Sequence, residues 1–193
     1  MQQRTIDAIA TQLEQCSHQV EPTRFVTISG PSGAGKSYAA EQLAHLLAVP
    51  IIPTDAYYLP DNLIPSVAIE DGAVHYDHPA ALQLGQLAID MLRLQGGDPI
   101  VLPDTGEHIS PARIIVVEGI VANYPTIRAL AGLAVCVTAP PVVRAQRRAM
   151  RDAAHYGRDP DSTLWAFWHI VEPDYQRFHA ENDYQVDLTI DTI

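Results

Sequence analysis

Residues 30–37 of this chain read Gly30-Pro31-Ser32-Gly33-Ala34-Gly35-Lys36-Ser37. They fit the phosphate-binding loop pattern G-x-x-x-x-G-K-[ST], in which glycines let the backbone curl and aim successive N–H groups at phosphate oxygens. Residues 25–29 read as a buried strand before the loop, and apolar residues recur at helical spacing from Ala39 to Leu47 after it. The sequence therefore predicts a strand, an anion-binding loop and a helix, with the positive end of the helix dipole facing the anion.

Two side chains of this loop carry chemistry of their own. Lys36 is placed to reach the β- and γ-phosphates of a nucleotide, and the Ser37 hydroxyl is placed to ligate Mg²⁺. Lys36 is also the only lysine in the chain. A glycine-rich turn that binds nothing is the alternative, and the flanking strand and helix argue against it. We therefore expect ATP and Mg²⁺ as cofactors, with nucleotide contacts from Gly30, Ser32, Gly33, Ala34, Gly35, Lys36, Ser37 and Tyr38.

The length, charge and cysteine content of the chain limit its class. At 193 residues it is most simply one domain with a substantial core. Its net charge of −11 disfavours a nucleic-acid backbone or an anionic membrane as a partner. Cys16 and Cys136 have no metal-binding or redox spacing, no apolar run approaches the ~18 residues of a membrane span, and the N-terminus has no signal pattern. We expect a cytoplasmic protein, and its oligomeric state, monomer or homo-oligomer, stays open.

Strands and helices are predicted to alternate along the chain. Further buried strands are predicted at 49–53, 114–117, 134–138 and 186–190, with an extended segment at 99–103. Residues 60–78 look irregular, and helices are predicted from Pro79 through 84–92, at 126–131, at 142–155, and at 162–178 with a kink or restart at Pro173. The alternation predicts an α/β fold with a central parallel sheet, helices on both faces and ligands at the carboxyl ends of the strands. A helical extension over residues 1–22, with its helix at 5–19, is expected before the main domain at 23–193.

Two carboxylates fall at the ends of predicted strands, at the edge where the loop also lies. Glu118 ends the strand at 114–117, the position of the acidic residue that helps to hold Mg²⁺ in phosphate-loop enzymes. Asp55 follows the strand at 49–53, so it should face the γ-phosphate from the acceptor side, where a kinase needs a group that accepts a hydroxyl proton. The plainer interpretations are a strand-end carboxylate without a role and a turn aspartate.

Positive charge is concentrated in one segment, because five of the eleven arginines lie between residues 144 and 158. One helix face carries four of them: Arg144, Arg147, Arg148 and Arg151. Like charges on one face repel, and a bound polyphosphate would relieve the repulsion through guanidinium contacts. The alternative is a solvated face paired with the chain's many acidic residues. Arg158 lies in a predicted break at 156–160 that is suited to closing over ATP, so we expect an arginine-rich lid over about 144–160.

Further motifs follow the loop in a characteristic order. They are Asp55-Ala56-Tyr57-Tyr58, Tyr76-Asp77-His78-Pro79, Glu118-Gly119-Ile120, and Arg144-Ala145-Gln146-Arg147-Arg148-Ala149-Met150-Arg151-Asp152 followed by Gly157-Arg158-Asp159. In combination, over residues 25–190, the chain resembles the uridine kinase and phosphoribulokinase group of phosphate-loop kinases, and within it the uridine–cytidine kinases. The resemblance implies the P-loop NTPase fold of the nucleoside and nucleotide kinases. It also implies an ATP-dependent phosphotransferase with an alcohol acceptor.

The resemblance further implies roles for single residues. Asp55 corresponds to a catalytic base that lies near Mg²⁺, so the implied metal set is Ser37, Glu118 and Asp55. Asp77 corresponds to the carboxylate that holds sugar hydroxyls, and His108 to a histidine that contacts the pyrimidine edge. The implied catalytic residues are Asp55, Lys36, Arg148 and Arg151, and Arg144 and Arg151 add contacts to ATP. The acceptor would be held by Asp55, Tyr58, Asp77, His108, Arg148 and Arg158.

The chain departs from the family pattern at the implied base pocket. Pro103 and Thr105 stand where the family has Tyr and Phe, which stack on and bond the pyrimidine, and Glu172 stands in place of a common lysine. The acceptor therefore stays open between uridine or cytidine and another sugar-like or vitamin-like alcohol, as in phosphoribulokinases or pantothenate kinases.

Two other classes of function compete with a kinase. A guanine-specific GTPase switch reads its base with Asn/Thr-Lys-x-Asp, and a chain whose single lysine lies in the loop cannot contain that motif. A non-catalytic nucleotide-binding module has no need of an acceptor-side carboxylate such as Asp55. The sequence thus favours a kinase whose partners are ATP and a small-molecule alcohol.

Overall fold

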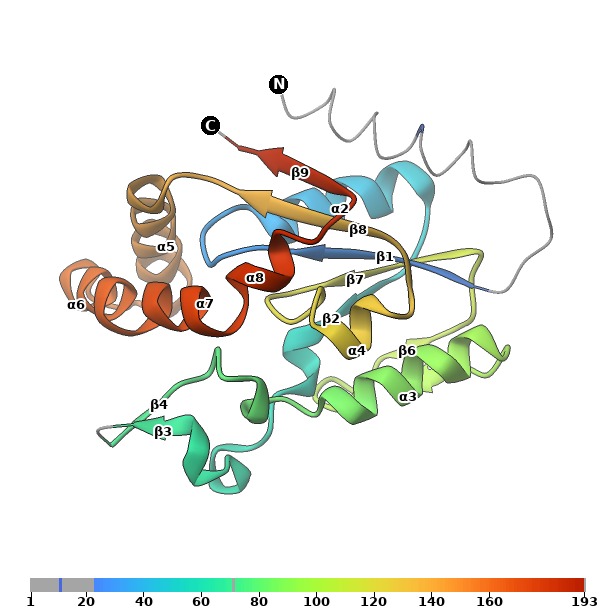
Figure 1. Ribbon diagram of the computed structural model, residues 1–193, viewed down its shortest axis with the longest axis horizontal. Coiled ribbons are helices and arrows are strands. Elements are labelled where there is room, and N and C mark those ends of the chain that lie inside the picture. Colours follow the sequence, from blue (N-terminus) through green and yellow to red (C-terminus); the bar gives the residue numbers. More distant parts are fainter. Residues whose placement is uncertain (1–10, 12–22, 71, 193) are drawn as a thin grey trace.

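The structure, a computed structural model, describes residue 11 and residues 23–70 and 72–192. The helix expected at 5–19 lies outside these residues, apart from Thr11. A five-stranded sheet forms the centre of the described part (Figure 1), in the order β2-β7-β1-β8-β9, with all neighbours parallel. Its strands are β1 (Arg24–Ser29), β2 (Ile51–Pro53), β7 (Ile114–Glu118), β8 (Ala131–Thr138) and β9 (Leu188–Asp191). The predicted α/β class and parallel sheet are confirmed.

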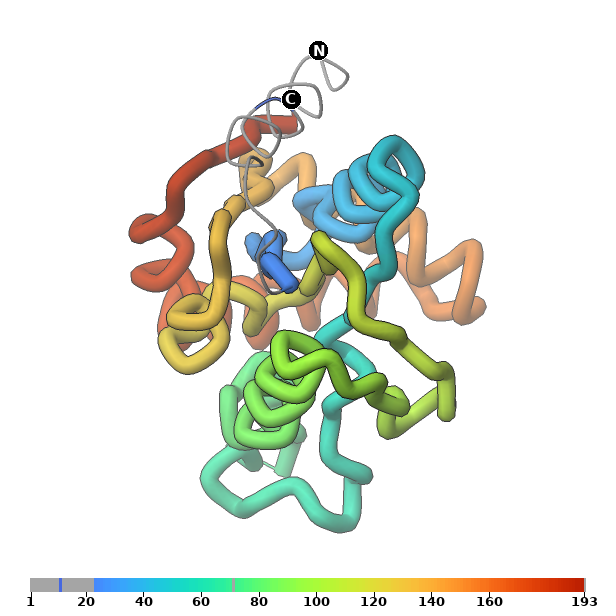
Figure 2. The backbone as a smooth tube through the Cα atoms, turned by 90° about the vertical axis from the view of Figure 1, so that its right-hand side faces the viewer, coloured from blue at the N-terminus to red at the C-terminus, as the bar shows by residue number. Residues whose placement is uncertain are grey.

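Helices cover both faces of this sheet because its apolar side chains alternate between them. Val26 and Ile28 of β1 pack in one cluster with Leu43 of α2 (Lys36–Leu47). Phe25 packs in a second cluster with Leu87 of α3 (Leu84–Gln95) and with α4 (Pro125–Arg128), below the sheet in Figure 2. Successive strand residues point to opposite faces, so a sheet buried on both faces needs continuous apolar strands of the kind seen in the sequence.

The C-terminal helices gather beside the carboxyl edge of the sheet (Figure 1). The first of them, α5 (Pro141–Tyr156), ends at Gly157, whose φ of 62° is the left-handed conformation that glycine adopts readily. The predicted helix at 142–155 and the break after it are therefore confirmed. Next come α6 (Pro160–Ala166), a π-helical turn η5 (Phe167–Val171), α7 (Glu172–Phe178) and α8 (Ala180–Asp183). None of the described helices has the length and apolar content needed to cross a membrane.

The kink or restart predicted at Pro173 is confirmed as a restart, because α7 begins at Glu172 with Pro173 in its first turn. The irregularity between α6 and α7 is the π turn η5, which ends at Val171. Pro173 lies in the first turn of α7, where its missing N–H interrupts no helical hydrogen bond.

The segment between β2 and β7 extends away from the sheet (Figure 1) and carries short elements on either side of α3. They are η1 (Thr54–Tyr57), η2 (Asp61–Leu63), η3 (Ser66–Ala68), β3 (Ile69–Glu70), β4 (Ala73–Val74), η4 (Pro79–Ala81), β5 (Ile100–Val101) and β6 (His108–Ile109). The prediction that Pro79 opens the helix at 84–92 is wrong. Pro79 opens only the short turn η4, since Leu82 is extended and pairs with Tyr58 before α3 begins.

Gly119, directly after β7, fixes how closely the chain passes the end of β2. Its φ is +147°, and a Cβ atom at this position would lie 1.7 Å from Oγ1 of the buried Thr54. Glycine is needed here both for the backbone conformation and for the approach of the two strand ends. Those ends carry Asp55 and Glu118, so the contact sets the spacing of the two carboxylates.

We expect Gly119→Ala to lower the free energy of unfolding by roughly 2 kcal/mol or more, because the added methyl group clashes and strains the backbone. Chemical denaturation monitored by circular dichroism measures this. Gly85→Ala in α3 is the matched control, since a Cβ there meets no atom within 4 Å. It should shift the free energy by less than about 1 kcal/mol, and equal losses in the two variants would contradict the assignment.

Candidate active site

The loop and the carboxyl ends of the strands enclose a cavity of about 350 Å³. Most of the residues predicted to act in the site line it: Ser32, Lys36, Ser37, Asp55, Tyr58, Asp77, Glu118, Arg148, Arg151 and Arg158. A second cavity of about 250 Å³ shares the loop and α5 walls and adds Gly33, Gly35 and Tyr38. Of the other predicted residues, Gly30, Ala34, Arg144 and His108 line neither of these two cavities.

Two glycines give the loop its shape. Gly30 has a φ of +138°, and a Cβ there would lie 2.0 Å from the carbonyl oxygen of Val137 in β8. Gly33 has a φ of +79°, and a Cβ there would lie 2.3 Å from the carbonyl oxygen of Arg144 in α5. The loop is therefore wedged between β8 and the first turn of α5, at an approach that no side chain permits. Gly35 is the residue before α2, so the N-terminus of that helix faces the loop.

Lys36, Ser37 and Glu118 meet at the base of the cavity. Lys36 Nζ donates a hydrogen bond of 3.3 Å to the carbonyl oxygen of Pro31, and Ser37 Oγ donates one of 3.1 Å to Glu118 Oε1. Burial raises the pKa of Glu118, while the charge of Lys36 and the Ser37 hydroxyl act to lower it. A hydroxyl and a carboxylate are the oxygen ligands that Mg²⁺ takes beside water and nucleotide phosphates, so these two residues fit that ion.

Asp55 lies in η1, directly after β2, and opens onto the cavity. Desolvation by the surrounding protein raises the pKa of Asp55, whereas the charges of Lys36 and Arg151 act to lower it. A carboxylate that faces two cations across a cavity can stay ionised and accept a proton from a hydroxyl group.

Asp77 also lines the cavity, and one of its carboxylate oxygens is unsatisfied within the described part of the chain. Its Oδ2 atom is buried and has no hydrogen-bond partner among the described residues. Burial raises the pKa of Asp77 to about 6, against the charges of Arg148 and Lys36, which lower it. A buried acceptor atom without a donor calls for a partner, and the hydroxyl groups of a ligand in the cavity would supply one.

Three residues that the sequence did not single out hold Asp77 in place. His179 is buried, its Nε2 lies 2.5 Å from the carbonyl oxygen of Asp77, and burial lowers its pKa to about 4, so the neutral ring donates to that oxygen. His75 Nδ1 lies 2.8 Å and 2.9 Å from the two carboxylate oxygens of the buried Asp174 in α7. Residues 75–77 are thereby fastened to the C-terminal helices, by contacts between positions about 100 apart that no local motif could indicate.

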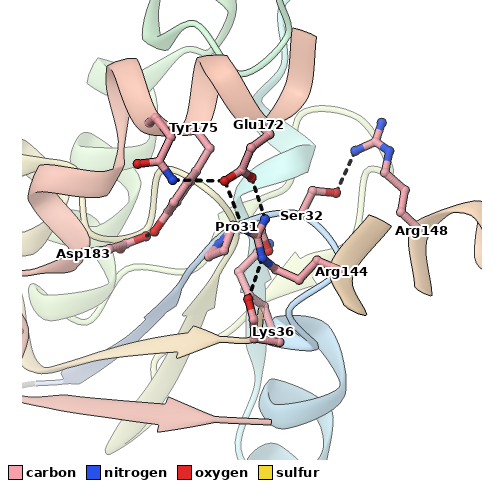
Figure 3. Close-up of polar contacts among 10 residues, drawn as sticks. Pro31, Ser32, Lys36, Arg144, Arg148, Glu172, Tyr175 and Asp183 are labelled. Atoms are coloured by element: carbon pink, nitrogen blue, oxygen red, sulfur yellow. Dashed lines mark hydrogen bonds and ion pairs between the residues drawn. The ribbon is translucent and has the colours of Figure 1, made fainter. Parts of the chain in front are cut away.

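The arginines predicted on one face of α5 have different partners, as Figure 3 shows for Arg144 beside Glu172 and Arg148 beside Ser32. Arg148 donates to Ser32 Oγ at 2.6 Å and lines the cavity with Arg151. Arg144 is buried: its Nη1 and Nη2 donate to the two oxygens of Glu172 at 2.7 Å and 3.1 Å, and its Nε donates to the carbonyl oxygen of Ala139. Its guanidinium group also lies 5.6 Å from the ring centre of Phe167. Arg144 therefore joins α5 to α7 rather than facing the cavity.

Arg147 has a partner directly after β9, because its two terminal nitrogens donate to Oγ1 and the carbonyl oxygen of Thr192, and it lines the second cavity only. The charges left for the cavity come from Arg148, Arg151 and Arg158. We expected a bound polyphosphate to relieve the repulsion among the arginines of α5. Contacts within the protein already relieve part of it.

The residues of the implied base pocket are not among those that line the two cavities. β5 and β6 form a hairpin in which His108 pairs with Val101, and the Pro103, Thr105 and His108 side chains are exposed. None of the three lines either cavity. The hairpin does not bring the predicted His108 to the other site residues.

A parallel sheet in this strand order, a loop wedged before α2 and an arginine-bearing helix over the strand ends define the α/β fold of the nucleotide kinases. Comparison with known proteins narrows the class. The model of the phosphoribulokinase / uridine kinase family matches residues 25–193, and the chain belongs to that family.

Proteins that are similar in sequence carry names that fit this family. The chain is 29% identical over 182 residues to a protein of Staphylococcus carnosus named uridine kinase. The alignment covers 87% of this chain and 86% of that protein. It is 28% identical over 187 residues to a uridine kinase of Lactobacillus helveticus, covering 89% and 88%. In fold it is similar to a structure described as a possible uridine kinase from Bacillus stearothermophilus, with a TM-score of 0.60, 16% identity and 99% and 100% of the two chains covered. The D-glycerate 3-kinase of Cryptococcus neoformans is similar with a TM-score of 0.58, 14% identity and coverage of 95% and 89%.

Glu172→Gln should lower the free energy of unfolding by about 3 kcal/mol, since it leaves the buried Arg144 charge uncompensated. It should leave the affinity for MgATP within about twofold, because neither residue lines the cavity. Denaturation and calorimetric titration measure the two quantities.

Arg177→Gln is the matched control, because Arg177 pairs with Glu70 at the same 2.7 Å but both side chains are exposed. Its loss of stability should be much smaller than that of Glu172→Gln, because solvent screens an exposed ion pair. A Glu172 variant that binds nucleotide tenfold more weakly would place Arg144 in the nucleotide site after all.

Proposed function

We propose that the protein is an ATP-dependent kinase that transfers the γ-phosphoryl group to a hydroxyl group of a small molecule. The observation that carries the proposal is the meeting, in one cavity, of phosphate-binding and acceptor-binding groups. Lys36, Ser37 and Glu118 line this cavity together with Asp55 and Asp77. Nucleotide binding alone gives no reason for carboxylates on the acceptor side.

The residues of the cavity have separate roles in this reaction. Ser37 and Glu118, with Asp55 nearby, would hold Mg²⁺, which would supply positive charge against the nucleotide phosphates. Lys36, Arg148 and Arg151 surround the transferred group with positive charge, which is worth more in a cavity than in water. Asp55 orients the acceptor hydroxyl and takes its proton, and Asp77 accepts hydrogen bonds from neighbouring hydroxyl groups.

A pyrimidine nucleoside, uridine or cytidine, is the first candidate acceptor, supported by the name of the curated relatives and by Asp77, which suits the vicinal diol of a ribose. A different sugar-like alcohol is the second candidate. It is favoured by the exposed hairpin, where Pro103, Thr105 and His108 leave the cavity without contacts to a base. Rates with uridine, cytidine, ribose-like sugars and pantothenate as separate acceptors distinguish the two candidates.

Asp55→Asn should lower kcat by at least about 100-fold while the Kd for MgATP stays within about threefold, because an amide cannot accept the proton. Acceptor-dependent ADP release and calorimetry measure these values. Asp104→Asn is the control, since Asp104 is exposed and acts on Asp55 only through its charge. Full turnover in the Asp55 variant would remove Asp55 from the role of base.

The acceptor kcat/KM should fall by up to about tenfold per pH unit below pH 6, because Asp77 has a raised pKa of about 6 and loses acceptor strength when protonated. The loss should appear in the KM for the acceptor rather than in the KM for ATP. Asp77→Asn should have a low kcat/KM without this pH step. A step that survives in the Asp77 variant would belong to another group.

A further inference from the structure

Asp152 of α5 occupies the centre of the arginine cluster. Its side chain is 1% exposed, and the residue nevertheless lines the cavity. Asp152 follows Arg151 in the lid motif, and neither the sequence analysis nor the proposed mechanism gives it a role. A carboxylate buried this deeply beside a phosphate-binding cavity needs a physical reason, because burying a charge is unfavourable unless it is paired.

The two oxygens of Asp152 have different partners. Oδ1 accepts a hydrogen bond of 2.9 Å from Nε of Arg151 and forms an ion pair of 2.7 Å with Nη2 of the same residue. Oδ2 lies 3.6 Å from Nε of Arg148 and 3.7 Å from Nη1 of Arg158. The Asp152 carbonyl oxygen also accepts a hydrogen bond of 3.2 Å from the N–H of Arg158. One carboxylate thus contacts the three arginines that line the cavity.

The contacts to Oδ2 are looser than those to Oδ1. Distances of 3.6 Å and 3.7 Å are ion pairs but lie beyond hydrogen-bond range. Nε of Arg148 is buried and has no hydrogen-bond partner among the described residues, and the Arg158 side chain is 61% exposed. Asp152 therefore holds Arg148 and Arg158 near each other without accepting a side-chain hydrogen bond from either. Their guanidinium groups can thus turn toward another anion.

We propose that Asp152 is a positioning residue, a built-in counter-anion that holds Arg148, Arg151 and Arg158 together before the nucleotide binds and yields them to its phosphates. The proposal rests on the proposed function, since it needs a nucleotide in the cavity. It has a directional consequence. The Asp152 charge repels the phosphates while it orders the arginines, so removing the charge should tighten nucleotide binding and slow phosphoryl transfer.

Asp152→Asn tests this, because asparagine keeps the shape and loses the charge. The Kd for the Mg²⁺ complex of the β,γ-imido analogue of ATP should fall about 3- to 10-fold, by calorimetry. The kcat should fall about tenfold, since unordered arginines stabilise the transition state less well. By linkage, the analogue should also restore more thermal stability to the variant than it gives to the wild type.

Glu172→Gln is the matched control, because it breaks another buried arginine–carboxylate pair of α5 that lies outside the cavity. Glu172→Gln should lower the melting temperature about as much as Asp152→Asn does. It should leave the Kd for the analogue within about twofold of the wild-type value. Nucleotide binding that is unchanged or weaker in Asp152→Asn would overturn the proposal, because a structural aspartate predicts either result.

The two proposals fail in different ways. If the wild-type protein does not bind the analogue, the proposed function fails and this inference fails with it. If the wild type binds and Asp152→Asn does not bind more tightly, only the inference fails. Should Asp152→Asn not fold, the comparison moves to the Arg151→Gln background, where Arg151→Gln/Asp152→Asn removes one charge of each sign. The double variant should then bind the analogue more tightly than Arg151→Gln alone, and equal or weaker binding would contradict the proposal.

Discussion

The close approach of Gly33 to the carbonyl oxygen of Arg144 is the contact on which the site depends. It joins the loop to the first turn of α5, and only a residue without a side chain allows it. Once the start of α5 is fixed, Arg148 and Arg151 lie about one and two turns further along the helix. Arg148 then donates to Ser32 of the loop, and Arg151 lines the same cavity. The pairing of Arg144 with Glu172 then fixes α7 against α5, and α7 in turn carries Asp174, which holds the segment before Asp77.

Charge in the cavity is balanced without a ligand, although the chain as a whole is strongly acidic. Burial raises the pKa of Asp55, Asp77 and Glu118, and in each case Lys36 is among the charges that act in the opposite direction. A lysine in this position therefore serves the acids as well as a phosphate. Residues of opposite charge line the cavity together: Lys36, Arg148, Arg151 and Arg158 with Asp55, Asp77, Glu118 and Asp152. A nucleotide and Mg²⁺ would enter as a complex that still carries negative charge, so its phosphates would draw the arginines away from these carboxylates.

Local pattern was enough to predict the parts of the fold and site that follow directly from a strand or a motif. The loop, the parallel sheet and the strand ends at Asp55 and Glu118 needed only apolar runs and glycine spacing. Helical spacing placed four arginines on one face, but the face is wide, and the partners at Glu172 and Thr192 that draw Arg144 and Arg147 aside come from distant segments.

The remaining features depend on contacts that no window of sequence contains. Asp152 and His179 matter through the neighbours that the fold gives them, and the start of α3 depends on the pairing of Leu82 with Tyr58. His108 was assigned by family resemblance alone, and it is an exposed residue of the hairpin that lines neither cavity.

Transfer of labelled phosphate tests the central claim most directly. The protein would be incubated with Mg²⁺ and ATP labelled at the γ-phosphate, together with uridine, cytidine, a ribose-like sugar or pantothenate, and the products separated. A kinase places the label on at least one of these alcohols, in a reaction that requires the alcohol. Label that stays on ATP or appears only as inorganic phosphate, in a protein that binds ATP tightly, would contradict a phosphotransferase with these acceptors and point to a nucleotide-binding module.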